Sequence, residues 1–147
     1  MTVVMIGVDP HKASHTAVAI NAAEQPLGQL RVRASAVQAE RLLGWAQGWP
    51  ERAWAVEGAG GLGHLLAQQL LSAGERVLDV PPQLAARVRL LATGDVNKND
   101  PNDARSVAVA ALRSAQVRQE LGGELTAGGV HRARRLMPSR SRPAWVR

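Results

Sequence analysis

The 147-residue sequence contains no cysteine, and this absence excludes several classes of site. Disulfide frameworks and thiolate metal sites both require cysteine, so a zinc-finger route to DNA is excluded and a reducing compartment is expected. No apolar run approaches the ~20 residues that a membrane-spanning helix needs, and the N-terminus lacks the features of a secretory signal. We therefore expect a cytoplasmic protein without a membrane partner, in which oxygen or imidazole must bind any metal ion.

The chain has little unbalanced charge outside its last 35 residues, although its net charge is +6. Residues 1–112 hold ten Lys or Arg and ten Asp or Glu, a net charge of 0, whereas residues 113–147 hold eight Arg and two Glu, a net charge of +6. The segment from 116 to 147 is rich in Gly, Arg, Ser and Pro, so we expect it to be disordered. This segment is either a basic arm that binds phosphates without sequence preference or a sequence produced by out-of-frame translation.

Apolar patterns over residues 1–115 predict a single α/β domain. Three short strands should form an antiparallel meander, and helices then alternate with two further strands. The expected strands are 3–8, 15–20, 28–33, 52–56 and 75–80, and the expected helices are 36–47 after an N-cap at Ser35, 62–72 before a C-cap at Gly74, 82–91 and 101–115. This order is typical of the RNase H-like (RuvC-like) fold, a mixed sheet with helices on both faces.

Four carboxylates fall where that fold would bring them together: Asp9 after the first strand, Glu57 after the fourth, and Asp100 and Asp103 at the last helix. Strand ends border the crevice where ligands bind, and residues three apart share a helix face. Clustered carboxylates repel one another unless a cation neutralises them, and hard oxygen ligands select Mg²⁺ or Mn²⁺. Such ions activate water or a 3′-hydroxyl during phosphodiester cleavage.

Each carboxylate except Glu57 also has a purely structural interpretation. Asp9 precedes Pro10 and could simply start a turn. Asp100 could be an N-cap, with Asp103 in the favourable first turn of the helix dipole. These roles are compatible with metal binding, so local sequence leaves both open.

The strings GVDPHKASHTAVAI, AVEGAGGLGHLL and KNDPNDARSVAVAAL resemble the three acidic motifs of the insertion sequence one-hundred-and-ten family of transposases and its relative, the pilin-gene invertase. The resemblance covers about residues 3–113. It implies a RuvC-like domain with catalytic, metal-binding Asp9, Glu57, Asp100 and Asp103, and nucleic-acid contacts at Lys12, Lys98 and Arg105. It further implies Mg²⁺-dependent DNA transposition, an element-encoded guide RNA and a homo-oligomer in the full-length family.

The sequence departs from that family after its last motif. Typical members continue into a second domain with a catalytic serine, and here an Arg-rich segment follows instead. We therefore expect a truncated copy that cannot complete transposition alone. The aromatic residue common after the family's Glu-x-x-Gly motif is also replaced, by Leu62 or Gly63.

The strongest alternative is a dinucleotide-binding Rossmann unit of an oxidoreductase. Gly58, Gly60 and Gly63 form a GxGxxG pattern between an apolar strand and a helix, and Asp79 ends the next strand. A simpler interpretation is that these glycines allow a tight turn beside Glu57.

Other motif residues have competing interpretations of the same kind. Trp45 and Trp49 are interpreted as packing residues rather than a base-stacking platform. His11 and His15 are interpreted as partly exposed turn residues rather than ligands of phosphate or metal.

Overall fold

The computed structural model describes residues 3–93 and 99–120 of the chain, and five strands of this part form one mixed sheet. The strands are β1 (Val4–Pro10), β2 (Ser14–Ile20), β3 (Pro26–Arg33), β4 (Arg52–Glu57) and β5 (Val77–Val80). Their order across the sheet is β3-β2-β1-β4-β5. The first three strands pair antiparallel, whereas β1, β4 and β5 pair parallel, as the predicted fold requires.

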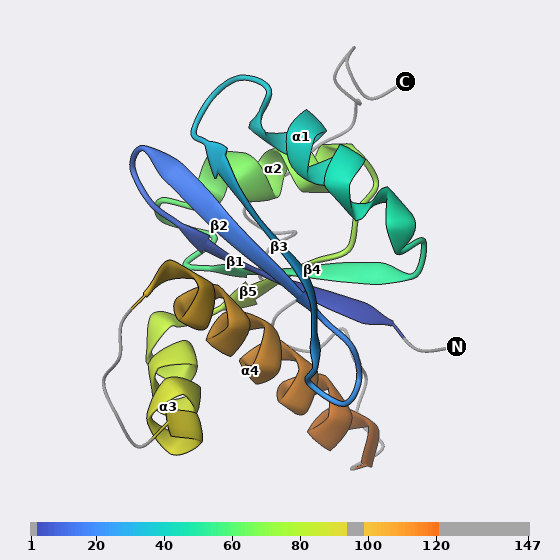
Figure 1. Cartoon of the computed structure of the whole chain (residues 1–147), viewed down its shortest axis with the longest axis vertical. Coiled ribbons are helices and arrows are strands. Elements are labelled where there is room, and N and C mark those ends of the chain that lie inside the picture. The colour runs from blue at the N-terminus through green and yellow to red at the C-terminus, as the bar shows by residue number, and fades with distance from the viewer. Residues whose placement is uncertain (1–2, 94–98, 121–147) are drawn as a thin grey trace.

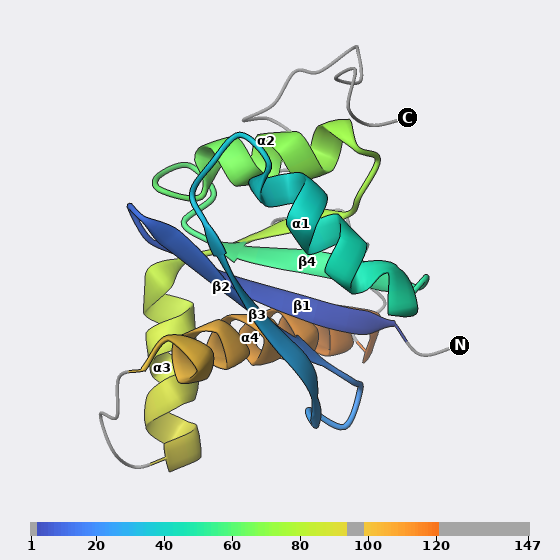
Figure 2. The same ribbon diagram turned by 45° about the horizontal axis from the view of Figure 1, so that its top comes forward.

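Helices cover both faces of the sheet (Figure 1). They are α1 (Gln38–Trp45), followed by the short 3₁₀ helix η1 (Ala46–Gly48), α2 (His64–Ser72), α3 (Pro82–Thr93) and α4 (Asp100–Glu120). Figure 2 shows α1 and α2 on one face of the sheet and α3 and α4 on the other. No helix in the described ranges is both long and apolar enough to cross a membrane.

Two apolar cores result, one on each face, because strand side chains alternate between the faces. Ile6 and Val8 of β1 belong to the core under α1 and α2, and Met5 belongs to the core under α3 and α4. The central strands are buried on both sides and therefore read as continuous apolar runs, whereas the edge strand β3 alternates. The predicted fold class is confirmed.

Some predicted element boundaries were wrong. Helix α1 begins at Gln38 and has no side-chain cap, because the Ser35 hydroxyl accepts a hydrogen bond from the Val37 amide within the turn before the helix. The last helix extends to Glu120, past the end predicted for that helix at residue 115. The segment from 121 to 147, with most of the predicted basic arm, lies outside the described residues. Gly74 follows the end of α2 with φ 88°, the left-handed conformation predicted for its C-cap.

Candidate active site

Asp9 and Glu57 lie side by side where β1 and β4 end. The two strands are parallel, with Val8 opposite Val56, so the next residue on each strand is one of the two acids. Strand alternation directs both side chains toward α3 and α4, since Gly7 contacts α4 and Ala55 belongs to the core on that side. Asp9 is only 7% exposed, and Glu57 is half-buried. The sheet therefore brings together the first two predicted site residues.

Helix α4 carries the third acid, and a glycine in β1 allows the helix to come close. A Cβ added to Gly7 would lie 2.1 Å from the Ala104 carbonyl oxygen and 2.6 Å from the Ala108 nitrogen. Both are backbone atoms, so a larger residue could be accommodated only by moving the helix. Asp103 directly precedes Ala104, and its position beside Asp9 and Glu57 depends on this contact.

Asp9 and Asp103 lie near enough to Glu57 for their charges to affect its ionisation. The pKa of Glu57 is raised, first by burial and then by the neighbouring charges of Asp9 and Asp103, with a further contribution from a hydrogen bond to Asp9. Each of these influences disfavours a second and third negative charge in the same place. The carboxylates of β1, β4 and α4 therefore form one mutually repelling group.

Two basic side chains offset part of this repulsion. Arg89 of α3 donates a hydrogen bond to the Asp103 carboxylate, and its charge opposes the upward shift in the pKa of Glu57. His11 lies with Nε2 2.8 Å from Oδ2 of Asp9. Sequence reasoning missed Arg89, because its partner depends on how α3 and α4 pack together and no local pattern marks it.

The N-terminus of α4 is capped by a residue that sequence analysis did not single out. The side-chain oxygen of Asn99 accepts a hydrogen bond from the Asn102 amide at 2.9 Å, and its carbonyl accepts one from the Asp103 amide at 3.0 Å. The interpretation of Asp100 as the N-cap was therefore wrong, because Asn99 already fills that position. Asp100 is the first residue of α4, and its side chain lies outside what the structure describes, as does all of Lys98.

The glycine-rich segment after Glu57 forms a turn. Gly58 has φ 59°, a left-handed conformation, and its amide donates to the Val80 carbonyl. Asp79 lies on the opposite face of the sheet from Glu57, and its carboxylate accepts a hydrogen bond from the Ala59 amide at 2.9 Å. In a Rossmann unit the Asp79 carboxylate would bind a ribose hydroxyl, but here it stabilises the turn that contains Gly60.

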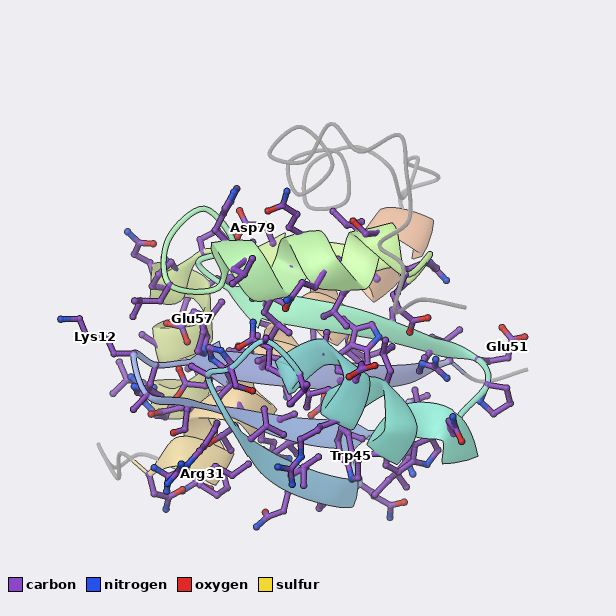
Figure 3. The ribbon with its side chains drawn as sticks, turned by 90° about the horizontal axis from the view of Figure 1, so that it is seen from above. Lys12, Arg31, Trp45, Glu51, Glu57 and Asp79 are labelled. Carbon is purple, nitrogen blue, oxygen red and sulfur yellow. The ribbon has the colours of Figure 1, made fainter. Side chains whose placement is uncertain are left out.

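The remaining predicted residues are dispersed. Lys12 is exposed in the turn between β1 and β2, toward the end of the sheet where Glu57 lies (Figure 3). The guanidinium of Arg105 donates to the carbonyl of Glu24, a fold contact in the turn between β2 and β3.

His15 is not a partly exposed turn residue as predicted: it is 4% exposed within β2, and its Nε2 lies 2.9 Å from Oε1 of Gln38. Burial lowers the pKa of His15 and favours its neutral form.

The two tryptophans pack as predicted. The rings of Trp45 and Trp49 meet edge to face, with centroids 5.0 Å apart, against the core under α1. Neither ring lies at the acidic group, and Figure 3 shows Trp45 away from Glu57 along the sheet.

Comparison with known proteins agrees with the geometry. The sequence model of the DEDD-type IS110 family, described as a transposase, matches residues 6–134. An uncharacterized 44.8 kDa protein of insertion element IS116 from Streptomyces clavuligerus is 31% identical over 105 residues. This match covers 71% of the present chain and 26% of the relative, so the chain spans about a quarter of that protein.

Solved structures show the same fold. RuvC of Thermus thermophilus in complex with a Holliday junction substrate superposes with a TM-score of 0.60 at 16% identity, covering 86% of this chain and 99% of RuvC. A second T. thermophilus RuvC structure gives a TM-score of 0.54 at 16% identity, with 81% and 96% covered. At this identity the likeness concerns the fold alone, and the sequence match supplies the family. The chain therefore belongs to the IS110 family of DEDD transposases, and its described residues form a RuvC-like domain.

Proposed function

We propose that this domain cleaves DNA phosphodiester bonds for transposition, using a divalent metal ion held by Asp9, Glu57 and Asp103, with Asp100 as the fourth ligand. One observation carries the proposal: on a RuvC-like fold, the ends of β1 and β4 and the first turn of α4 bring Asp9 and Asp103 near Glu57, so that burial first and then both charges raise the pKa of Glu57. Such mutual repulsion has no benefit for folding and is expected where a cation completes the site.

The donor chemistry fits Mg²⁺ or Mn²⁺, although the described side chains are not yet arranged around an ion. Within the described part of the chain, no three His, Asp or Glu residues form a group that could hold a metal ion as they stand. Arg89 holds Asp103, and Glu57 shares a hydrogen bond with Asp9, so both contacts must rearrange. Thr16 lies opposite Asp9 in register, and its buried hydroxyl has no partner among the described residues. The Thr16 hydroxyl is therefore a polar group beside the site that could contact a bound ion or its water.

When bound, the ion would supply Lewis-acid stabilisation of the scissile phosphate and of the leaving oxygen. The chain itself contributes orientation. Asp9 and Glu57 are fixed by the paired ends of β1 and β4, and Asp103 is fixed by the approach of α4 to Gly7. With its raised pKa, Glu57 retains a proton to higher pH than an ordinary glutamate and can release it when a cation arrives.

DNA is the proposed substrate, and the family resemblance suggests that a guide RNA and further copies of the full-length protein take part. Strand transfer would require the serine-bearing domain that the resemblance implies, which corresponds to no residue described here. Lys12 and Lys98 remain proposed nucleic-acid contacts. Arg105 also remains one, although its contact with Glu24 gives it a role in the fold.

The proposal is tested by Mn²⁺ titration followed through the melting temperature. A ligand that binds only the folded state stabilises it by RT ln(1 + [L]/Kd), so Mn²⁺ should raise the melting temperature of the wild-type chain. Glu57→Gln and Asp103→Asn should abolish this response. Glu51→Gln is the matched control, because Glu51 is exposed and lies far from Glu57 along the sheet (Figure 3).

Cleavage is then assayed with Mn²⁺ on a four-way DNA junction and on a linear duplex. The junction is included because the RuvC relative was solved with such a substrate. Equal melting temperatures for all variants with and without Mn²⁺ would refute the metal site. A normal Mn²⁺ response without cleavage of either DNA would leave the metal site intact but refute nuclease activity by this chain alone.

A further inference from the structure

A group of basic side chains lies on the same sheet face, and at the same end of the sheet, as the acidic site. In register, Arg31 of β3 lies opposite Thr16 of β2, which lies opposite Asp9 of β1. Because paired residues on neighbouring strands point to the same face, Arg31 and Asp9 share a face. Arg33 shares that face two residues further along β3, opposite Ser14.

The turn between β1 and β2 adds a third cation at this end. Lys12 lies in that turn, and the Ala34 amide, directly after β3, donates to the Ala13 carbonyl at 2.9 Å. This bond holds the end of β3 against the turn. Figure 3 shows Lys12, Arg31 and Glu57 toward one end of the sheet and Trp45 and Glu51 toward the other. We call Lys12, Arg31 and Arg33 the basic edge.

The basic edge is exposed, and described acidic residues do not neutralise it. All three side chains are exposed, and no described carboxylate forms an ion pair with them. Glu24 is the one acidic residue between positions 10 and 39, and its carboxylate is paired with Arg113 at the opposite end of the hairpin. The Arg31 side chain is oriented by a hydrogen bond from Nε to the Ser14 hydroxyl at 3.1 Å, which leaves its terminal nitrogens available.

We infer that the basic edge binds the backbone of the DNA strand whose phosphate enters the acidic site. The inference rests on the proposed nuclease function and assigns the path of its substrate. Charge complementarity supports it, because exposed arginines beside an acidic centre attract phosphates that the carboxylates alone would repel. Arginine also matches the geometry of phosphate better than lysine does, and it supplies two of the three cations.

The spacing agrees with a strand that crosses the end of the sheet. Neighbouring strands are about 4.8 Å apart, so the backbone of Arg31 lies about 10 Å from that of Asp9 and about 14 Å from that of Glu57. One strand of B-DNA carries a phosphate every ~3.4 Å of helix axis. Because the backbone winds around the axis, successive phosphates of one strand are further apart than this rise, so phosphates on the basic edge would lie only a few nucleotides from the cleaved bond.

The test measures how DNA binding by the full chain depends on salt. In EDTA, the affinity for a labelled four-way junction is determined from low to high salt for the wild type and for Arg31→Gln/Arg33→Gln. Each lost phosphate contact should reduce the slope of log K against log[salt] by about 1, so the double variant should lose about 1 to 2. The Arg-rich C-terminal segment is present in both proteins and cancels in the comparison.

Arg41→Gln/Arg76→Gln is the matched control, because it removes two exposed arginines away from the basic edge, in α1 and directly before β5. Its slope should equal that of the wild type. A slope unchanged in Arg31→Gln/Arg33→Gln, or an equal loss in the control, would overturn the inference. So would a loss seen with single-stranded RNA but not with DNA.

Mn²⁺ titration of the same variants separates this inference from the proposed function. The basic-edge variant should keep the wild-type Mn²⁺ response, because none of its substituted residues is a proposed ligand. If the wild type itself lacks the response, the metal site fails while the salt slopes still decide whether DNA binds at the basic edge.

Discussion

Replacing Gly7 with alanine should separate the acidic residues without changing any of them. The added Cβ would lie 2.1 Å from the Ala104 oxygen and 2.6 Å from the Ala108 nitrogen, and ordinary contacts begin at 3.4 Å. Since both atoms belong to the backbone of α4, the helix must move by roughly 1 Å or β1 must distort. Overpacking of this kind costs about 1–3 kcal/mol, and each kcal/mol lowers the melting temperature of such a domain by roughly 3–5 °C.

The same movement carries Asp103 away from Asp9 and Glu57. Metal ligation tolerates displacements of only ~0.2 Å, so Gly7→Ala should also reduce the Mn²⁺-induced rise in melting temperature. Gly44→Ala is the control: Gly44 lies in α1 with nothing within 4 Å of its added Cβ, so alanine should stabilise by about 0.5–1 kcal/mol. The reasoning is refuted if Gly7→Ala melts like the wild type and responds equally to Mn²⁺.

Three further substitutions test the electrostatics and the turn. Because the pKa of Glu57 is raised above its ordinary value of 4.5, the metal-free protein should lose stability as pH rises through the raised pKa, and Glu57→Gln should remove that decline in melting experiments. Arg89→Met should lower the metal-free stability by about 1–3 kcal/mol, because Asp103 loses its partner, yet strengthen Mn²⁺ binding by removing a competing cation; weaker Mn²⁺ binding in the titration would contradict this. Asp79→Ala should cost about 1–3 kcal/mol through the unsatisfied Ala59 amide, without any NADH affinity to lose, and saturable NADH binding by the wild type would contradict the turn assignment.

The sequence predicted the parts of the fold that depend on local pattern. Strand β1 is buried along almost its whole length, whereas side chains of β3 alternate between more and less buried. Both patterns can be predicted from the order of apolar and polar residues in the sequence. The positions of Asp9 and Glu57 were predictable for the same reason, because each lies at the end of an apolar strand. The RuvC-like fold then places these two strand ends side by side.

Features that depend on packing between elements could not be predicted. Gly7 looks like an unremarkable small residue in an apolar strand, and only the position of α4 reveals its role. Arg89 is one of two arginines in α3, and nothing local distinguishes it from Arg87, which is exposed. Asn99 and Asp100 are both good N-caps in adjacent positions, so propensity alone could not choose between them.

The acidic site therefore depends on two kinds of residue, and substitutions of the two kinds should change the metal-free stability in opposite directions. Glu57 is a proposed ligand that is strained by its neighbours, so Glu57→Gln should stabilise the metal-free protein above the raised pKa and abolish the Mn²⁺ response. Gly7 and Asp79 are not metal ligands in this proposal, but Gly7 allows the approach of α4 and Asp79 holds the turn after Glu57. Their variants should therefore lower both the metal-free melting temperature and its rise with Mn²⁺.

Two separate measurements, the melting temperature without metal and its rise with Mn²⁺, therefore distinguish proposed ligands from residues that only support the fold. A merely structural acidic cluster predicts a different pattern, because Glu57→Gln would then change metal-free stability while all variants kept the same response to Mn²⁺. That outcome would show that the carboxylates meet for the fold and not for an ion, and the proposed nuclease activity would fail with it.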